Sequence, residues 1–209
     1  PGGRGKSALV ARWALAVARN GRAAVALLPV SLRFNLAQRR TAFPLLGARL
    51  RHLLSDGRSQ ASYPDTDMWL SEIAAYLRER RPSDLPLLVI IDGADEATDW
   101  EVGRDLRVSS EVLPNLKVLV AARPLPHDLS NEWRERIGWN PDQVCLLNLT
   151  FLDRESVAQM VETEKYRLGG ESADVNVIAN ELYRLSEGDP ILVRLYVEWL
   201  ASDPNDHSS

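Results

Sequence analysis

The sequence predicts a three-layer α/β fold with a parallel sheet, followed by a small helical subdomain. Short apolar runs alternate with segments of helical periodicity over residues 1–150, and the pattern becomes purely helical over residues 151–209. Strands that alternate with helices form right-handed crossovers, which cover both faces of a parallel sheet. We therefore expect an α/β core in residues 1–150 and a helical subdomain in residues 151–209.

The first elements are a helix and a strand. Residues 6–20 carry apolar side chains at a spacing of four, at Leu9, Trp13 and Val17, which predicts a helix. The short apolar run over residues 23–30 is typical of a strand. Because Pro29 has no backbone N–H to donate to a neighbour, we expect this strand at an edge of the sheet.

Two helices and three strands are expected next. Pro44 is expected to begin a helix that runs to residue 54, and a second helix is expected over residues 67–80. Residues 87–91 are unbroken Leu, Val and Ile, which is typical of a parallel strand covered on both faces. The apolar runs over residues 116–122 and 144–149 predict two more strands.

Three helices are expected after residue 150. Asp153 is placed to cap the first, and an apolar stripe over residues 175–185 marks the second. Gly188 is expected to end the second helix, and Asp189-Pro190 to begin the third.

Composition excludes several classes of function. The chain has 25 basic and 29 acidic residues and a net charge of −4, so we do not expect nucleic acid or a membrane surface as a partner. No apolar run approaches the roughly 20 residues of a membrane span. The single cysteine, Cys145, fits a reducing, cytoplasmic environment, and its place in an apolar run predicts burial. The sequence opens on Pro1 without an initiator Met, so we expect a part of a longer protein.

A glycine-rich segment precedes the first predicted helix. Gly2-Gly3-Arg4-Gly5-Lys6-Ser7 fits the pattern G-x-x-x-x-G-K-[ST], whose first glycine would fall before Pro1. Such glycines let backbone N–H groups surround a phosphate, and the helix N-terminus adds the positive end of its dipole. Lys6 would bridge the β- and γ-phosphates of ATP or ADP, and the Ser7 hydroxyl would bind Mg²⁺. The alternative is a chance glycine-rich turn.

Acidic residues follow the most apolar strand. Asp92 ends this strand at the edge where open α/β sheets bind ligands, which predicts a Mg²⁺ ligand. Gly93 allows the chain to turn, and we expect this turn to bring Asp95 and Glu96 towards the γ-phosphate. The sequence leaves open which of the two orients the attacking water, and we slightly favour Asp95. The alternative is an ordinary acidic turn after a strand.

Arg123 follows the strand over residues 116–122. At that position an arginine can stabilise the charge of a γ-phosphate. The alternative is a surface arginine before a proline-rich turn.

Four motifs occur in order, over residues 1–7, 89–96, 119–124 and 187–196. They resemble the Walker A, Walker B, sensor 1 and G-x-P motifs of STAND-class P-loop ATPases with a NACHT-type nucleotide-binding domain. The resemblance implies an ASCE/AAA+-like P-loop NTPase fold with sheet order 5-1-4-3-2, whose first strand lies outside this sequence. It also implies that Pro190 lies near the adenine and Arg123 near the γ-phosphate.

The same resemblance implies a function. It predicts a regulatory switch with slow ATP hydrolysis, homo-oligomerisation through the NTPase domain, and fused effector and sensor domains in signal transduction or antiviral defence. One alternative is a nucleotide-bound scaffold without hydrolysis, against which the presence of both Asp95 and Glu96 argues. Another is an AAA+ DNA-loading ATPase, which usually has Glu where this chain has Gly93, and which the acidic net charge fits poorly.

Overall fold

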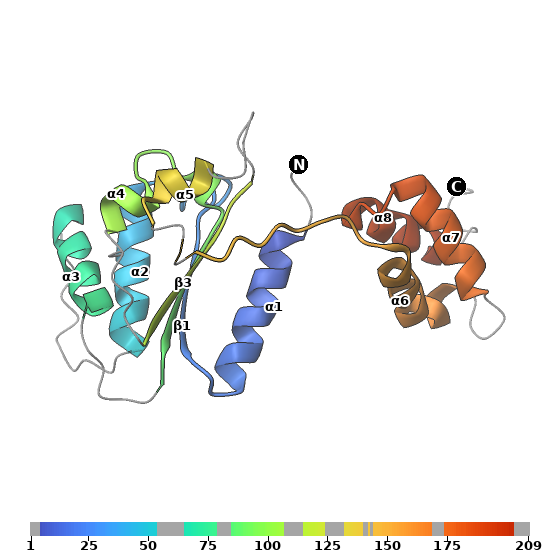
Figure 1. Ribbon diagram of the computed structural model, residues 1–209, viewed down its shortest axis with the longest axis horizontal. Coiled ribbons are helices and arrows are strands. Elements are labelled where there is room, and N and C mark those ends of the chain that lie inside the picture. Colours follow the sequence, from blue (N-terminus) through green and yellow to red (C-terminus); the bar gives the residue numbers. More distant parts are fainter. Residues whose placement is uncertain are drawn as a thin grey trace. The chain divides into compact units, whose positions relative to one another are not determined.

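The chain forms two compact units, Ser7–Leu146 and a smaller unit that includes Leu147–Ser209 (Figure 1). The structure is a computed structural model. It describes residues 5–53, 65–78, 85–106, 115–123, 132–139, 142, 144–168 and 174–202.

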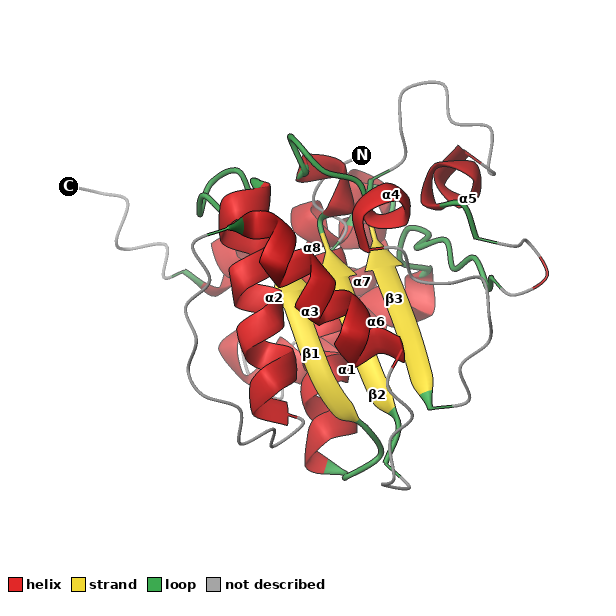
Figure 2. Cartoon of the chain, turned by 90° about the vertical axis from the view of Figure 1, so that its left-hand side faces the viewer, coloured by secondary structure: helices red, strands yellow, loops and turns green. Residues whose placement is uncertain are grey.

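A parallel sheet forms the centre of the larger unit (Figure 2). In the described part of the chain it has three strands in the order β1 (Ala24–Pro29), β2 (Leu87–Asp92) and β3 (Leu116–Ala121). Asp92 lies level with Pro29 on one side and with Ala121 on the other, so the three strands end together. The strand that contains Pro29 lies at an edge, as expected from its missing N–H.

Helices cover both faces of this sheet. Figure 1 shows α1 (Lys6–Arg19) on one side of the strands, and α2 (Arg39–Leu53) and α3 (Thr66–Arg78) on the other. Alternate side chains of β2 enter the two cores: Leu88 and Ile90 pack in the cluster that contains Ala14 of α1, and Leu87, Val89 and Ile91 join the cluster of α2 and α3. The unbroken apolar strand is therefore buried on both faces.

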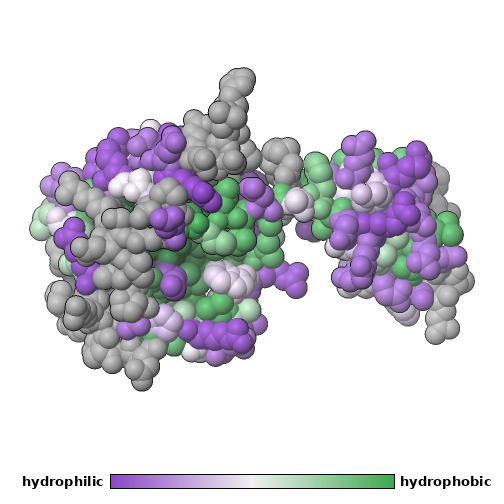
Figure 3. Space-filling view, in the orientation of Figure 1, coloured by the Kyte–Doolittle hydropathy of each residue, from purple (hydrophilic) through white to green (hydrophobic). Residues whose placement is uncertain are grey.

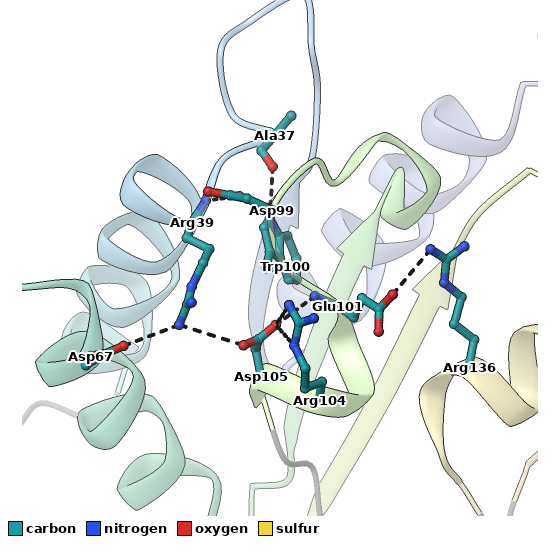
Figure 4. A network of polar contacts seen from close by, with 9 residues as sticks. All are labelled: Ala37, Arg39, Asp67, Asp99, Trp100, Glu101, Arg104, Asp105 and Arg136. Atoms are coloured by element: carbon teal, nitrogen blue, oxygen red, sulfur yellow. Dashed lines mark hydrogen bonds and ion pairs between the residues drawn. The ribbon is translucent and has the colours of Figure 1, made fainter.

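Short elements follow β2 and β3. The 3₁₀ helix η1 (Ala94–Glu96) and α4 (Val102–Leu106) come after β2, and α5 (Glu132–Ile137) comes after β3. Trp100 is buried and donates from Nε1 to the Ala37 oxygen at 2.9 Å, as Figure 4 shows. This bond ties the segment after β2 to the segment before α2.

The smaller unit contains helices with their own core. They are α6 (Arg154–Glu164), the 3₁₀ helix η3 (Lys165–Leu168), α7 (Val175–Ser186) and α8 (Pro190–Ala201). The buried residues are Val157, Val161, Ala179, Leu182, Val193 and Val197. Asp153 caps α6 through the Ser156 N–H, and Asp189 caps α8 through the N–H groups of Ile191 and Leu192. Both caps confirm the sequence-based expectation.

The predicted strand over residues 144–149 is wrong. These residues have no regular secondary structure, and Cys145 is exposed rather than buried. A strand needs a partner for its backbone hydrogen bonds, and no described strand lies beside this segment. β3 likewise has only β2 as a described neighbour, and its side chains are only half-buried or exposed.

The expected start of one helix also needs correction. α2 begins at Arg39 rather than Pro44, because its first N–H bonds the carboxylate of Asp99 at 2.8 Å, a cap from a distant segment. Leu9 and Trp13, whose spacing predicts the helix α1, are 53% and 44% exposed. Figure 3 shows apolar residues on this face of the larger unit, over β3 and α1. None of the described helices has the length and apolar character needed to cross a membrane.

Candidate functional site

The candidate residues of the larger unit gather at the carboxyl-terminal end of the sheet. Figure 1 shows α1 running antiparallel to the strands, so its first turn lies at this same end. Gly5 precedes the helix with φ 75°, Lys6 is its first residue, and Ser7 is exposed. The first N–H groups of any α-helix have no partner within the helix, and the helix dipole makes that end positive. Gly2, Gly3 and Arg4 lie outside the described residues.

Asp92 is fixed in the sheet by its own backbone and that of its neighbour. The Val30 N–H donates to the Asp92 oxygen at 2.7 Å, and the Gly93 N–H donates to the Ala121 oxygen at 2.8 Å. Both bonds continue the ladder beyond the strand ends. The backbone at Asp92 is therefore fixed between β1 and β3, and its side chain is half-buried.

Gly93 makes the turn that the sequence led us to expect. Its φ is 85°, in the left-handed region, and a Cβ at this position would lie 2.5 Å from the Val30 oxygen. Only glycine fits both the conformation and the space. The chain then enters η1, which carries Asp95 and Glu96 back over the ends of the strands.

Among the described residues, Asp95 is held by Arg123. The Arg123 backbone N–H donates to Asp95 Oδ1 at 2.9 Å, and Arg123 Nε lies 3.5 Å from Oδ2. The Asp95 side chain is 13% exposed. Arg123 is itself anchored, because Trp133 Nε1 donates to its carbonyl oxygen at 2.9 Å.

The Glu96 carboxylate accepts hydrogen bonds from residues that follow β1 and β3. Arg123 Nη2 donates to Glu96 Oε1 at 3.0 Å, and the Leu32 N–H, just beyond β1, donates to Oε2 at 3.0 Å. Sequence reasoning missed Leu32, since a backbone amide carries no residue-type signal. The positive φ of Asn35, 56°, marks a tight turn at this place in the structure.

The charged side chains at the carboxyl-terminal end of the sheet can bind a cation and an anion side by side. The Asp95 and Glu96 carboxylates pair with one guanidinium, that of Arg123, and Asp92 ends the central strand level with Ala121 of β3. Mg²⁺ is usually bound through one or two carboxylates, waters and substrate phosphates rather than by an all-protein cage. The donor set of Asp92 and the Ser7 hydroxyl fits that chemistry. No group of three or more His, Cys, Asp and Glu side chains in the described part of the chain could hold a metal ion by itself.

The structure thus brings Asp95, Glu96 and Arg123 into contact, and it places Asp92 and the start of α1 at the same end of the larger unit. Pro190 is the first residue of α8 and belongs to the smaller unit.

Comparisons with known proteins concern the fold. No family model and no curated protein matches the chain. The solved structure of the Aeropyrum pernix ORC2 protein in its ADP form is similar to this chain, with a TM-score of 0.52 and 19% identity over 92% of this chain and 52% of that chain. The chain therefore spans about half the length of that protein. At this identity the similarity shows the fold alone.

Proposed function

We propose that this chain is an ATP-binding module of the P-loop type, which binds ATP or ADP with Mg²⁺ and hydrolyses ATP slowly. The observation that carries the proposal is that Ser7, in the first turn of α1, lies at the same end of the sheet as Asp92, Asp95, Glu96 and Arg123. The similarity to ORC2, which was solved in its ADP form, supports nucleotide binding.

Each residue has a role in this proposal. The backbone from Gly2 to Gly5, including Arg4, surrounds the β-phosphate, and Lys6 neutralises the β- and γ-phosphates. Ser7 and Asp92 hold Mg²⁺, which supplies positive charge to the transferring phosphoryl group. Arg123 contacts the γ-phosphate, and one of the two acids of η1 orients the attacking water.

We also propose the sheet order 5-1-4-3-2 for this fold, with β1, β2 and β3 as its strands 2, 3 and 4. Two observations support this order: β3 has no described neighbour on its outer edge, and apolar residues lie on the surface over β3 and α1 (Figure 3). A strand there would complete the burial of β3. Residues 144–149 would then gain a neighbour to pair with.

Two finer roles compete for this module. The Asp-Gly-x-Asp-Glu sequence over residues 92–96 supports a NACHT-type signalling or antiviral switch, in which the NTPase domain forms homo-oligomers and Pro190 contacts the adenine. The similarity to ORC2 instead favours an AAA+ DNA-loading ATPase, and it does so more than it favours the signalling role. Stimulation of ATP hydrolysis by double-stranded DNA would select the second role. ATP-dependent oligomerisation without a response to DNA would select the first.

The binding proposal is tested through Lys6. Lys6→Ala removes the cation aimed at the β- and γ-phosphates and should weaken ATP binding by about 1.5–3 kcal/mol, the contribution of a hydrogen bond to a charged group. Isothermal titration calorimetry with Mg²⁺ and ATP measures this. Arg12→Ala is the matched control, since it removes a cation from an exposed position of the same helix. Equal ATP affinity in Lys6→Ala and wild type would contradict the P-loop assignment.

A further inference from the structure

Arg123 lies two residues beyond the end of β3, outside the ladder of the sheet. The last described bond of the ladder between β2 and β3 runs from the Gly93 N–H to the Ala121 oxygen, at 2.8 Å. Beyond it, two side chains hold the backbone. The Arg123 N–H donates to Asp95 Oδ1 at 2.9 Å, and the Arg123 oxygen accepts a hydrogen bond from Trp133 Nε1 at 2.9 Å. Arg123 is therefore bonded on both sides of its Cα.

These two bonds restrain both backbone dihedrals of Arg123. A peptide unit is planar, so a residue has only two soft backbone dihedrals, one on either side of its Cα. The Arg123 N–H belongs to the peptide unit before the Cα, and the Arg123 oxygen belongs to the unit after it. Asp95 holds the first unit and Trp133 holds the second. Together the two bonds set the direction of the Cα–Cβ bond, and with it the region that the guanidinium can reach.

Trp133 is well placed to act as a support, because α5 is packed against α4. Its ring lies partly buried against the core of the larger unit. The guanidinium carbon of Arg136 lies over this ring, 5.5 Å from the centroid, and Arg136 Nη2 lies 3.4 Å from Glu101 Oε1 (Figure 4). Ile137 is buried, and a Cβ on Gly103 of α4 would lie 2.2 Å from the Ile137 oxygen. The indole N–H of Trp133 therefore has a defined position.

A second tryptophan shows that this core does not by itself require the indole to donate a hydrogen bond. Trp139 also lies partly buried against the same core. Its Nε1 is buried and has no hydrogen-bond partner among the described residues. Trp133 thus does more than fill space, since its N–H is spent on the backbone of the one arginine that the candidate site contains in the described part of the larger unit's sheet end.

We propose that Trp133 is a positioning residue of the nucleotide site, which holds the Arg123 carbonyl so that the guanidinium can contact a γ-phosphate. The inference rests on the proposed function, and it concerns the preference for ATP over ADP. Because ADP has no γ-phosphate, a displaced guanidinium weakens ATP binding and leaves ADP binding as it was. Loss of the indole N–H therefore changes the ratio of the two affinities, whereas a merely structural defect lowers both alike.

The test removes the Nε1–H and keeps an aromatic ring. Trp133→Phe should lower the preference for ATP over ADP about threefold to tenfold, the factor that one ordinary hydrogen bond represents, with ADP affinity unchanged. Calorimetry with Mg²⁺ and either ADP or a non-hydrolysable ATP analogue measures the two affinities. Trp139→Phe is the matched control, because it shortens the same type of side chain in the same core without removing a hydrogen bond to a described residue. Its affinity ratio should equal that of wild type.

A second replacement separates the hydrogen bond from the size of the ring. Incorporation of 3-benzothienylalanine in place of Trp133 puts a sulfur atom where the indole has its N–H and keeps the shape of the side chain. The preference for ATP should fall as it does in Trp133→Phe. A wild-type ratio with this replacement would overturn the proposal, even if Trp133→Phe fails to fold.

A double variant shows whether the effect acts through the Arg123 side chain. Arg123→Ala should itself lower the preference for ATP, and Trp133→Phe should lower it no further in that background, because the carbonyl then positions no guanidinium. An equal further loss in both backgrounds would overturn the proposal and leave Trp133 a packing residue. If wild-type protein binds neither nucleotide, the proposed function itself fails. Wild-type binding with a preference that Arg123→Ala abolishes and Trp133→Phe leaves intact would contradict the Trp133 assignment alone.

Discussion

Gly93 is subject to two separate steric demands. Its φ of 85° costs an L-amino acid with a Cβ about 1–2 kcal/mol. In addition, a Cβ at this position would lie 2.5 Å from the Val30 oxygen, which is held by the sheet. The orientation of Asp95 and Glu96 therefore depends on a residue that has no side chain of its own.

Gly93→Ala should lower the free energy of unfolding by about 3 kcal/mol, because the backbone strain and the clash with Val30 add. Gly21→Ala is the control. Gly21 also has a positive φ, 62°, but open space where its Cβ would lie, so this variant should cost about 1 kcal/mol. Urea denaturation followed by tryptophan fluorescence compares them. Equal losses for the two variants would show that the edge of the sheet relaxes around the new methyl group.

Asp105 of α4 links the segments that surround it. As Figure 4 shows, its Oδ2 accepts the Glu101 N–H and Arg104 Nη2, each at 2.8 Å, and its Oδ1 lies 3.7 Å from Arg39 Nη2 of α2. Burial alone would raise the pKa of Asp105, but its bonds to Arg104 and the Glu101 amide and the charge of Arg39 outweigh burial, and the pKa lies below its usual value. The ionised form is therefore the one that stabilises the fold.

Asp105→Asn should cost about 1–2 kcal/mol at neutral pH, where wild type has the full benefit of the charged form. A carboxylate whose pKa is lowered in the folded state contributes stability above its unfolded pKa of about 3.9, and loses it as the pH falls through the folded value. The difference between wild type and variant should thus shrink below about pH 4. Denaturation curves from pH 7 to pH 3 measure this. A constant difference would show that the charge of Asp105 is unimportant. Glu198→Gln, which breaks an exposed pair with Arg194, should leave the stability close to that of wild type at any pH.

Comparison of particular elements shows what the sequence can and cannot predict. The edge position of Pro29, the cap at Asp189 and the turn at Gly93 depend on one residue and its immediate neighbours, and the structure has all three. The start of α2 depends on Asp99, which lies 60 residues from the Arg39 N–H, so a local pattern could not reveal it.

In the candidate site, too, local features were predictable and a contact between distant segments was not. Residue type and position after a strand were enough to place Asp95, Glu96 and Arg123 at the carboxyl-terminal end of the sheet. The partner of Glu96 was not predictable, because the Leu32 N–H belongs to the backbone and is brought there by the parallel pairing of β1 with β2. The wrong prediction of a strand over residues 144–149 has a related cause. An apolar run forms a strand only where a neighbouring strand pairs with its backbone N–H and C=O groups.

The chain has separate hydrophobic cores in its two units. The larger unit is stabilised by clusters on both faces of the sheet, and the smaller one by a cluster within α6, α7 and α8. Gly188 is a critical point of the smaller unit. Its φ is 79°, its oxygen accepts the Leu152 N–H at 2.8 Å, and a Cβ there would lie 2.1 Å from the Leu152 oxygen.

Separate cores predict separate cooperative units of unfolding. Gly188→Ala should destabilise the smaller unit by about 3 kcal/mol through the same combination of strain and clash as at Gly93. In hydrogen-exchange mass spectrometry, peptides from α6, α7 and α8 should then exchange faster, while those from β1, β2 and β3 keep the wild-type rate. Gly138→Ala is the control, since Gly138 has φ 70° and open space at the Cβ position in the larger unit, and it should leave the exchange of α6–α8 unchanged. Acceleration spread evenly over both units in Gly188→Ala would mean that they unfold together, because a single cooperative unit transmits a local loss of stability to every amide that exchanges through global opening.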